Sequence, residues 1–138
     1  MPMNITCEQV QGRVPITVLG IQGELDGSNF QQLIGRAQEV YGAGARHILV
    51  DMSEMTFMSS AGLVALHSIA LLLAGQALPD YQNGWAAFHA VERTAETGSQ
   101  GAVKLLKPRE RVERTLRIAG MDTYLELYQD MAVAIDSF

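Results

Sequence analysis

The sequence predicts an α/β domain in which helices pack on a mixed sheet, and three observations predict it. Apolar runs of strand length alternate along the chain with segments whose apolar residues recur at helical spacing. The chain has 138 residues, enough to bury one hydrophobic core. Its hydrophobic fraction of 48% is typical of a globular protein. We therefore expect a single domain that spans residues 1–138.

Two strands are predicted near the start of the chain. Residues 5–10, ITCEQV, alternate apolar and polar side chains, as in a strand with one buried face. Residues 14–23, VPITVLGIQG, are rich in β-branched residues, and Pro15 suits the first position of a strand or an edge strand. The intervening QGR predicts a tight turn, so the two strands are expected to form a hairpin.

A helix is predicted after the loop that begins with GELD. Ser28 or Asn29 can cap this helix, and Gly42 and Gly44 end it. Its apolar residues recur at helical spacing and are Phe30, Leu33, Ile34, Ala37 and Val40.

The second half of the predicted sheet also alternates with helices. RHILVDM, residues 46–52, predicts a strand in the middle of the sheet, and a strongly apolar helix follows from about Ser60 to Gly75. AVKLLKP, residues 102–108, predicts another strand. A helix is predicted next, with Pro108 at or near its first position and Gly120 as its stop. The last segment, residues 123–136, predicts one amphipathic helix, with a short strand at its start as the alternative.

Residues 76–101 form a long insertion between the apolar helix and the next strand. Connections of this kind usually have about 2–6 residues. Trp85, Phe88, Val91 and Ala95 recur there at helical spacing, which predicts a short extra helix. The helix at 61–75 is apolar nearly all round and so needs cover on every side. We expect Trp85 to pack against this helix, in the same chain or across a homodimer interface.

Composition and charge exclude several classes of protein. The net charge is −5 and no block of Lys or Arg stands out except around KPRERVERTLR, which argues against general nucleic-acid binding. The lone Cys7 excludes an internal disulfide and a cysteine-rich metal site, and fits the cytoplasm. The first residues lack the features of a signal peptide. The apolar helix, about 22 Å long, is too short to cross a membrane. We expect no metal and no cofactor.

The segment FMSSAGLVAL, residues 57–66, places two serines between a predicted strand and a predicted helix. Ser59 or Ser60 can cap the helix, which is worth about 1 kcal/mol. A serine hydrolase would need a base and an oxyanion hole. Met58 breaks the G-x-S-x-G pattern and no histidine is suitably placed, so we expect no enzyme. The third hypothesis is a regulatory phosphoserine, because a helix start tolerates the added negative charge.

Three motifs in order resemble a STAS domain, and more closely an anti-sigma factor antagonist, or anti-anti-sigma factor. They are GELD at residues 23–26, RHILVDMSEMTFMSSAGLVAL at 46–66 and KLLKPRERVERTLRIAGMDTYLEL at 104–127. The resemblance extends from about Ile5 to Ile135, with the insertion at 76–101. It implies a STAS-like fold with a mixed four- to five-stranded sheet and helices packed on one side.

The resemblance also implies a phosphorylation site. In this family an Asp-Ser-Ser/Thr-Gly-Leu motif starts the second helix, and its first serine is phosphorylated by a partner that is both anti-sigma factor and kinase. That serine corresponds to Ser60, with Ser59 as the second choice. Ser59 stands at the aspartate position, which removes a fixed negative charge, and Ala61 stands at the second hydroxyl position. Asp26 matches a residue near the phosphoserine, and a loop acid or helix cap is the equal alternative.

The function implied is that of a bacterial, cytoplasmic regulator of transcription. The unmodified protein would bind an anti-sigma factor and serine kinase of the histidine-kinase-like ATPase type, and so free a sigma factor. Phosphorylation of Ser60 would abolish binding, and a PP2C-type phosphatase would restore it. The expected partner-binding residues are Gly23, Glu24, Asp26, Met58, Ser59, Ser60, Ala61, Gly62 and Leu63. The alternatives are a non-phosphorylated STAS scaffold, associated with a stressosome or a transporter, and a small enzyme or ligand binder.

Overall fold

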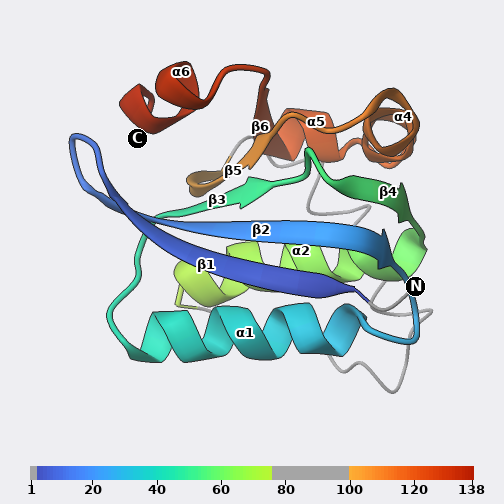
Figure 1. The fold of residues 1–138 in the computed structure, drawn as a ribbon, viewed down its shortest axis with the longest axis horizontal. Helices are drawn as coiled ribbons and strands as arrows, with labels where there is room; N and C mark the ends of the chain where they lie inside the picture. Colours follow the sequence, from blue (N-terminus) through green and yellow to red (C-terminus); the bar gives the residue numbers. More distant parts are fainter. Residues whose placement is uncertain (1–2, 76–99) are drawn as a thin grey trace.

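The structure is a computed structural model that describes residues 3–75 and 100–138. These residues form a six-stranded mixed sheet flanked by helices (Figure 1). Five strands run in the order β1-β2-β3-β5-β6, and β4 pairs with β2. The elements are β1 (Asn4–Gln11), β2 (Pro15–Leu25), α1 (Phe30–Gly42), β3 (Ile48–Asp51), β4 (Met55–Met58), α2 (Ser60–Leu73), β5 (Gln100–Leu106), α4 (Glu110–Ile118), α5 (Met121–Tyr124), β6 (Leu125–Tyr128) and α6 (Met131–Asp136). The predicted α/β class with a mixed sheet is confirmed.

The predicted hairpin is present, and its second strand organises the sheet. β1 and β2 pair antiparallel in an unbroken register, whereas the other pairings are parallel. β2 is long enough to take two neighbours in succession on one side. Its residues 17–20 pair with β3, and its residues 23–25 pair with β4.

β4 has no counterpart among the predicted strands and brings the sheet to six strands, where four or five were expected. The four residues MTFM are too short to show a strand period. A tight turn precedes them, in which Ser53 N donates to the Asp51 carboxylate over 3.0 Å. In the same turn the Glu54 carbonyl accepts a hydrogen bond from Gly23 N over 3.1 Å. β4 therefore carries the chain directly to the start of α2, beside the end of β2.

Helices cover both faces of the sheet, although helices on one side were expected. Leu19 and Ile21 of β2 belong to the main core, which also contains buried residues of α1, α2 and α4. The alternate residues Ile16 and Val18 point to the other face, where Ala134 of α6 covers them. The C-terminal part of the last segment forms α6 as a separate short helix, which covers this second face.

The last segment was predicted as one helix, and this prediction is wrong. Residues 121–136 form α5, β6 and α6, so the alternative of a short strand is nearer to the structure. β6 pairs in parallel with β5, with Leu127 beside Leu105. Asp130 then caps α6 by accepting a hydrogen bond from Val133 N over 3.0 Å. Pairing with a neighbouring strand therefore overrides the helical pattern of this segment.

Lys104 of β5 is buried beneath the C-terminal segment and is only 4% exposed. Its ammonium group donates to the carbonyl and hydroxyl oxygens of Ser137, each over 3.0 Å, and lies 3.4 Å from the Glu126 carboxylate. The rings of Tyr128 and Phe138 lie 5.5 and 4.9 Å from the same nitrogen atom. The Tyr128 hydroxyl also donates to Glu126, and this hydrogen bond is the main reason why the pKa of Glu126 is lowered, with a smaller contribution from Lys104.

The apolar helix α2 is buried from Gly62 to Ala70, as its composition predicts, and α1 lies alongside it (Figure 1). His67 is buried in the middle of α2, and burial lowers its pKa. The expected short helix of the insertion and the packing of Trp85 lie outside the described residues. A homodimer through residues 61–75 and the insertion stays a prediction.

The start of α4 differs slightly from the prediction. α4 begins at Glu110, so Pro108 lies two residues before the helix rather than at its first position. Within residues 3–75 and 100–138, no helix combines the length and the apolar character required to cross a bilayer.

Candidate functional site

The predicted site lies at the end of the sheet where β2 and β4 finish and where α1 and α2 begin (Figure 1, right-hand side). The Leu25 carbonyl at the end of β2 accepts a hydrogen bond from Ser59 N over 2.9 Å. This bond joins the GELD segment directly to the start of α2. Two motifs more than thirty residues apart in the sequence are therefore side by side, as the resemblance implies.

The two serines at the start of α2 differ in their contacts. Ser59 is the N-cap, and its hydroxyl accepts a hydrogen bond from Ala61 N over 3.2 Å. Ser60 is the first residue of the helix and is exposed. Its hydroxyl has no hydrogen-bond partner among residues 3–75 and 100–138. Ser59 thus supplies the cap, and capping does not explain Ser60.

The difference between the serines predicts unequal effects on stability. Ser59→Ala is expected to lower the free energy of unfolding by about 1 kcal/mol, because it removes the cap. Ser60→Ala is expected to change it by less than about 0.5 kcal/mol, because an exposed hydroxyl without a partner is removed. Urea unfolding of the two variants and the wild type measures both values. Equal losses in the two variants would contradict the assignment of the cap to Ser59.

The loop between β2 and α1 is held by its own side chains. The Asp26 carboxylate accepts hydrogen bonds from the backbone N–H, over 2.9 Å, and the hydroxyl of Ser28. These bonds lower the pKa of Asp26, so it carries a negative charge at neutral pH. Asn29 precedes α1, but its side chain accepts from Asp26 N and donates to the Glu24 carbonyl instead of capping the helix. Asp26 is therefore an ordered, ionised loop acid.

The predicted partner-binding residues divide into a surface set and a buried set. Glu24 and Ser60 are exposed, and Gly23, Asp26, Ser59 and Ala61 are partly exposed. Met58 and Leu63 are 2% and 3% exposed, and Gly62 is buried against Met58 and Leu25. These three residues lie in the core beneath Ser60, so their side chains are not on the exposed surface, and their part in partner binding stays a prediction.

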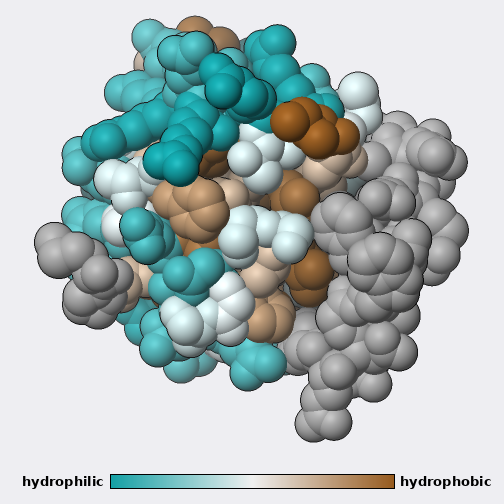
Figure 2. Space-filling model, turned by 90° about the vertical axis from the view of Figure 1, so that its right-hand side faces the viewer, coloured by the Kyte–Doolittle hydropathy of each residue, from teal (hydrophilic) through white to brown (hydrophobic). Residues whose placement is uncertain are grey.

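Close packing accounts for the glycine at position 62. A Cβ atom there would lie 2.3 Å from Met58 Cγ and 3.1 Å from Leu25 Cδ2. Real Cβ atoms do not approach other atoms to 2.3 Å, so the start of α2 lies on β4 at a distance that only glycine permits. Figure 2 views this end of the molecule face on. Weakly polar and apolar residues occupy the middle of the face, and hydrophilic residues lie above and below it.

Two arginines at the start of α4, Arg109 and Arg111, lie against β4 and the turn before it, and sequence reasoning missed them as part of the site. α4 packs against β4. The guanidinium group of Arg111 lies 5.3 Å from the centre of the Phe57 ring. Arg109 donates to the Ser53 carbonyl over 2.9 Å. The basic run was visible in the sequence, but only the packing of α4 on β4 places Arg111 over Phe57, three residues before Ser60.

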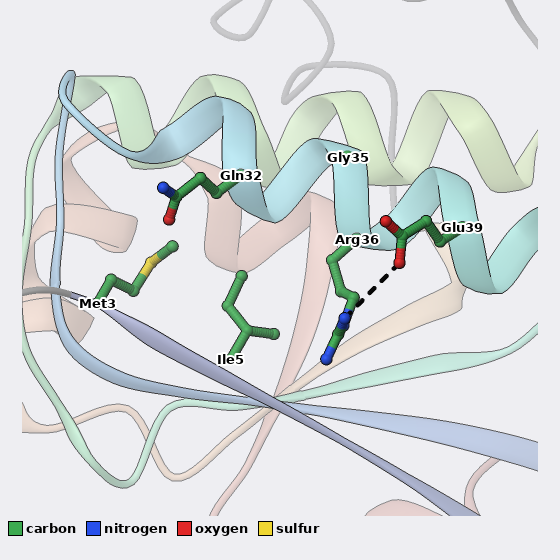
Figure 3. Close-up of a pocket in the computed structure, with 6 residues that line it drawn as sticks. All are labelled: Met3, Ile5, Gln32, Gly35, Arg36 and Glu39. Atoms are coloured by element: carbon green, nitrogen blue, oxygen red, sulfur yellow. Dashed lines mark ion pairs between the residues drawn. The ribbon is translucent and has the colours of Figure 1, made fainter.

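The described grooves and histidines lie away from both serines. The groove in Figure 3 has a volume of about 410 Å³ and lies between β1 and α1. Its lining consists of Met3, Ile5, Gln32, Gly35, Arg36 and Glu39, with an ion pair of 3.6 Å between Arg36 and Glu39. His67 lies buried two turns into α2, and the His47 ring packs on Phe138. His89 lies outside the described residues. Among the residues that the structure describes, no group of three potential metal ligands is present.

Comparison with known proteins identifies the family of this chain. The family model of the STAS domain matches residues 8–76, half of the chain, and this range includes both serines and the GELD segment. The chain belongs to the STAS domain family. No curated protein matches the chain.

Solved STAS-like structures share the fold over nearly the whole chain. An anti-sigma factor antagonist from Mycobacterium paratuberculosis is 18% identical, with a TM-score of 0.65 over 96% of this chain and 91% of its own. A putative anti-sigma factor antagonist from Thermotoga maritima is 16% identical, with a TM-score of 0.67 over 96% and 92%. The unphosphorylated anti-sigma factor antagonist SpoIIAA is 16% identical, with a TM-score of 0.58 over 94% and 92%. At these identities the likeness establishes the fold, so the predicted family and the STAS-like fold class are confirmed.

Proposed function

We propose that this STAS domain protein is a non-enzymatic anti-sigma factor antagonist, active in the bacterial cytoplasm. It binds a kinase-type anti-sigma factor of the histidine-kinase-like ATPase class and thereby frees a sigma factor. Phosphorylation of Ser60 abolishes this binding. The observation that carries the proposal is the separation of roles between the two serines. Ser59 caps α2, whereas Ser60 stands exposed and unbonded to any described residue, beside the ionised Asp26 loop.

The surface explains why a phosphate would act as a switch. A phosphoserine carries about −1.5 to −2 charges at neutral pH. Glu24 is exposed and Asp26 partly exposed on the same surface, so the phosphate adds to an acidic region. A partner carboxylate or a close apolar surface at Ser60 would then be repelled or kept solvated. The first turn of α2 tolerates the added charge because its N–H groups and dipole favour anions, so the domain stays folded.

The relatives with this fold support the proposal by analogy. The phosphorylated form of SpoIIAA, described as a Bacillus cell fate determinant, matches the chain with a TM-score of 0.54 and 15% identity. SpoIIAA therefore keeps this fold in its unphosphorylated and phosphorylated forms. By the same logic a PP2C-type phosphatase would restore binding here, and ATP would belong to the partner kinase.

One observation favours a second candidate function. The family aspartate is replaced by Ser59, whose side chain is used as a helix cap and offers no charge beside Ser60. A kinase that reads this aspartate would recognise the site poorly. The second candidate is a non-phosphorylated STAS scaffold or interaction module, associated with a stressosome or a transporter, that uses the same surface constitutively.

Affinity capture from a lysate of the source organism tests the proposal. Wild type, Ser60→Ala and Ser60→Asp serve as baits, and bound proteins are identified by mass spectrometry. Wild type and Ser60→Ala are expected to retain a histidine-kinase-like ATPase, and Ser60→Asp is expected to lose it. The control Gln38→Glu adds one negative charge to an exposed residue of α1 and should behave as the wild type. Capture of the same partners by all baits would contradict the switch and favour the scaffold.

A further inference from the structure

Arg111 differs from the other arginines of α4 in how its charge is compensated. Arg114 pairs with Glu110 at 3.4 Å, and Arg117 pairs with Glu113 at 3.5 Å. Arg109, which precedes the helix, lies 3.9 Å from the Glu54 carboxylate and donates to the Ser53 carbonyl. Arg111 forms no ion pair with a carboxylate of the described residues. Its exposed guanidinium group instead lies over the Phe57 ring, 5.3 Å from its centre.

The position of Phe57 places this uncompensated charge beside β4, the strand that leads into the candidate site. Phe57 belongs to β4 and precedes Ser60 by three residues. α4 packs against β4, and both lie at the end of the molecule where α2 starts (Figure 1). Three residues of chain span at most about 11 Å, and the turn from β4 into α2 shortens that distance. The Arg111 side chain is thus held at the strand that leads into Ser60.

A guanidinium group that lies over an aromatic ring is held there by the attraction between the cation and the ring, which uses none of its hydrogen-bond donors in an ion pair. Those donors form a fork that matches two oxygens of a phosphate group. An ion pair with a carboxylate would have occupied the fork, and the other arginines discussed above are occupied in that manner or by a carbonyl.

We propose that Arg111 binds the phosphate group of phosphorylated Ser60. The inference rests on the proposed phosphorylation of Ser60. The role of Arg111 is to hold the dianionic phosphate on the α4 side of Ser60, away from the acidic Glu24 and Asp26. Before phosphorylation of Ser60, the guanidinium group of Arg111 is available to an anion. After phosphorylation it binds the phosphate, which compensates its positive charge.

The test installs phosphoserine at position 60 by genetic-code expansion, so no kinase is needed. ³¹P NMR follows the second ionisation of the phosphate, whose ordinary pKa is about 6. Arg111 stabilises the dianion, so Arg111→Gln is expected to raise this phosphate pKa by about 0.3–0.7 units. The matched control is Arg114→Gln on the same helix, which removes an arginine already paired with Glu110 and should leave the pKa within about 0.2 units of wild type.

A second variant keeps the positive charge of Arg111 and removes the aromatic ring over which it lies. Phe57→Leu retains Arg111 but removes the ring that positions it, so it is expected to raise the phosphate pKa in the same direction by a smaller amount. The same phosphate pKa in wild type, Arg111→Gln and Arg114→Gln would overturn the inference. An equal rise of the phosphate pKa in both arginine variants would also overturn the inference, because it would show that any positive charge on α4 stabilises the dianion. The proposed switch itself is decided by the capture experiment and does not depend on either result.

Discussion

Replacing Lys104 with alanine is expected to lower the free energy of unfolding by about 3 kcal/mol. The substitution removes the ammonium group together with its two contacts to Ser137 and its ion pair with Glu126, all within 3.4 Å. The buried aliphatic stem also leaves a cavity beneath Tyr128 and Phe138. Release of a desolvated charge offsets part of this loss. Urea unfolding measures the change, and hydrogen exchange of residues 131–138 reports loosening of the C-terminal segment.

Two variants separate the causes of this effect. Lys104→Met keeps most of the volume and removes the charge, so it is expected to cost about 1 kcal/mol. Lys107→Ala changes an exposed lysine three residues away and should cost less than about 0.5 kcal/mol. A loss below about 0.5 kcal/mol for Lys104→Ala, with unchanged exchange of residues 131–138, would contradict the role assigned to Lys104.

Replacing Gly62 with valine is expected to lower the free energy of unfolding by about 3 kcal/mol. The first added carbon would lie 2.3 Å from Met58 Cγ, and the branches of valine would add to the clash with Leu25. Relief requires α2 to move away from β4 or Met58 to leave its position. Either change shifts the start of α2, so binding at the Ser60 surface should weaken together with stability. Urea unfolding measures the loss of stability.

Gly35 provides a matched control for this prediction. Gly35 also lies within a helix, but a Cβ atom there would meet nothing within 4 Å. Gly35→Val is therefore expected to leave stability unchanged or to raise it by about 0.4 kcal/mol, since valine has the higher helix propensity. Equal losses at the two positions would contradict the packing argument, because a Cβ atom at Gly35 meets no neighbour within 4 Å.

The double variant Met58→Ala/Gly62→Ala tests the same contact directly. Truncation of the buried Met58 alone should cost about 2–5 kcal/mol, because it leaves a cavity. In the double variant the alanine at position 62 enters the space that the methionine vacates. The combined loss should therefore be smaller than the sum of the two single losses by about 1 kcal/mol or more. Additive losses would mean that Met58 and Gly62 do not constrain each other.

Much of the candidate site could be predicted before the structure. The resemblance joined the GELD segment to the serines, and the hydrogen bond between Ser59 and Leu25 shows them side by side. The choice between Ser59 and Ser60 as the cap stayed open, because both are capping residues next to each other in the sequence. Met58, Gly62 and Leu63 were expected at the surface, whereas the structure buries them. A motif identifies which residues act together, but it does not show which of their side chains are exposed.

By itself the sequence determined the alternation of strands and helices, the apolar character of α2 and the family, because these depend on local periodicity and on motifs along the chain. Only the tertiary structure decided that β4 pairs with β2, that the last segment splits around β6, and that Arg111 lies over Phe57. The physical reason is common to all three. Each depends on contacts between residues far apart in the sequence, and such contacts outweigh local propensities of a few tenths of a kcal/mol per residue.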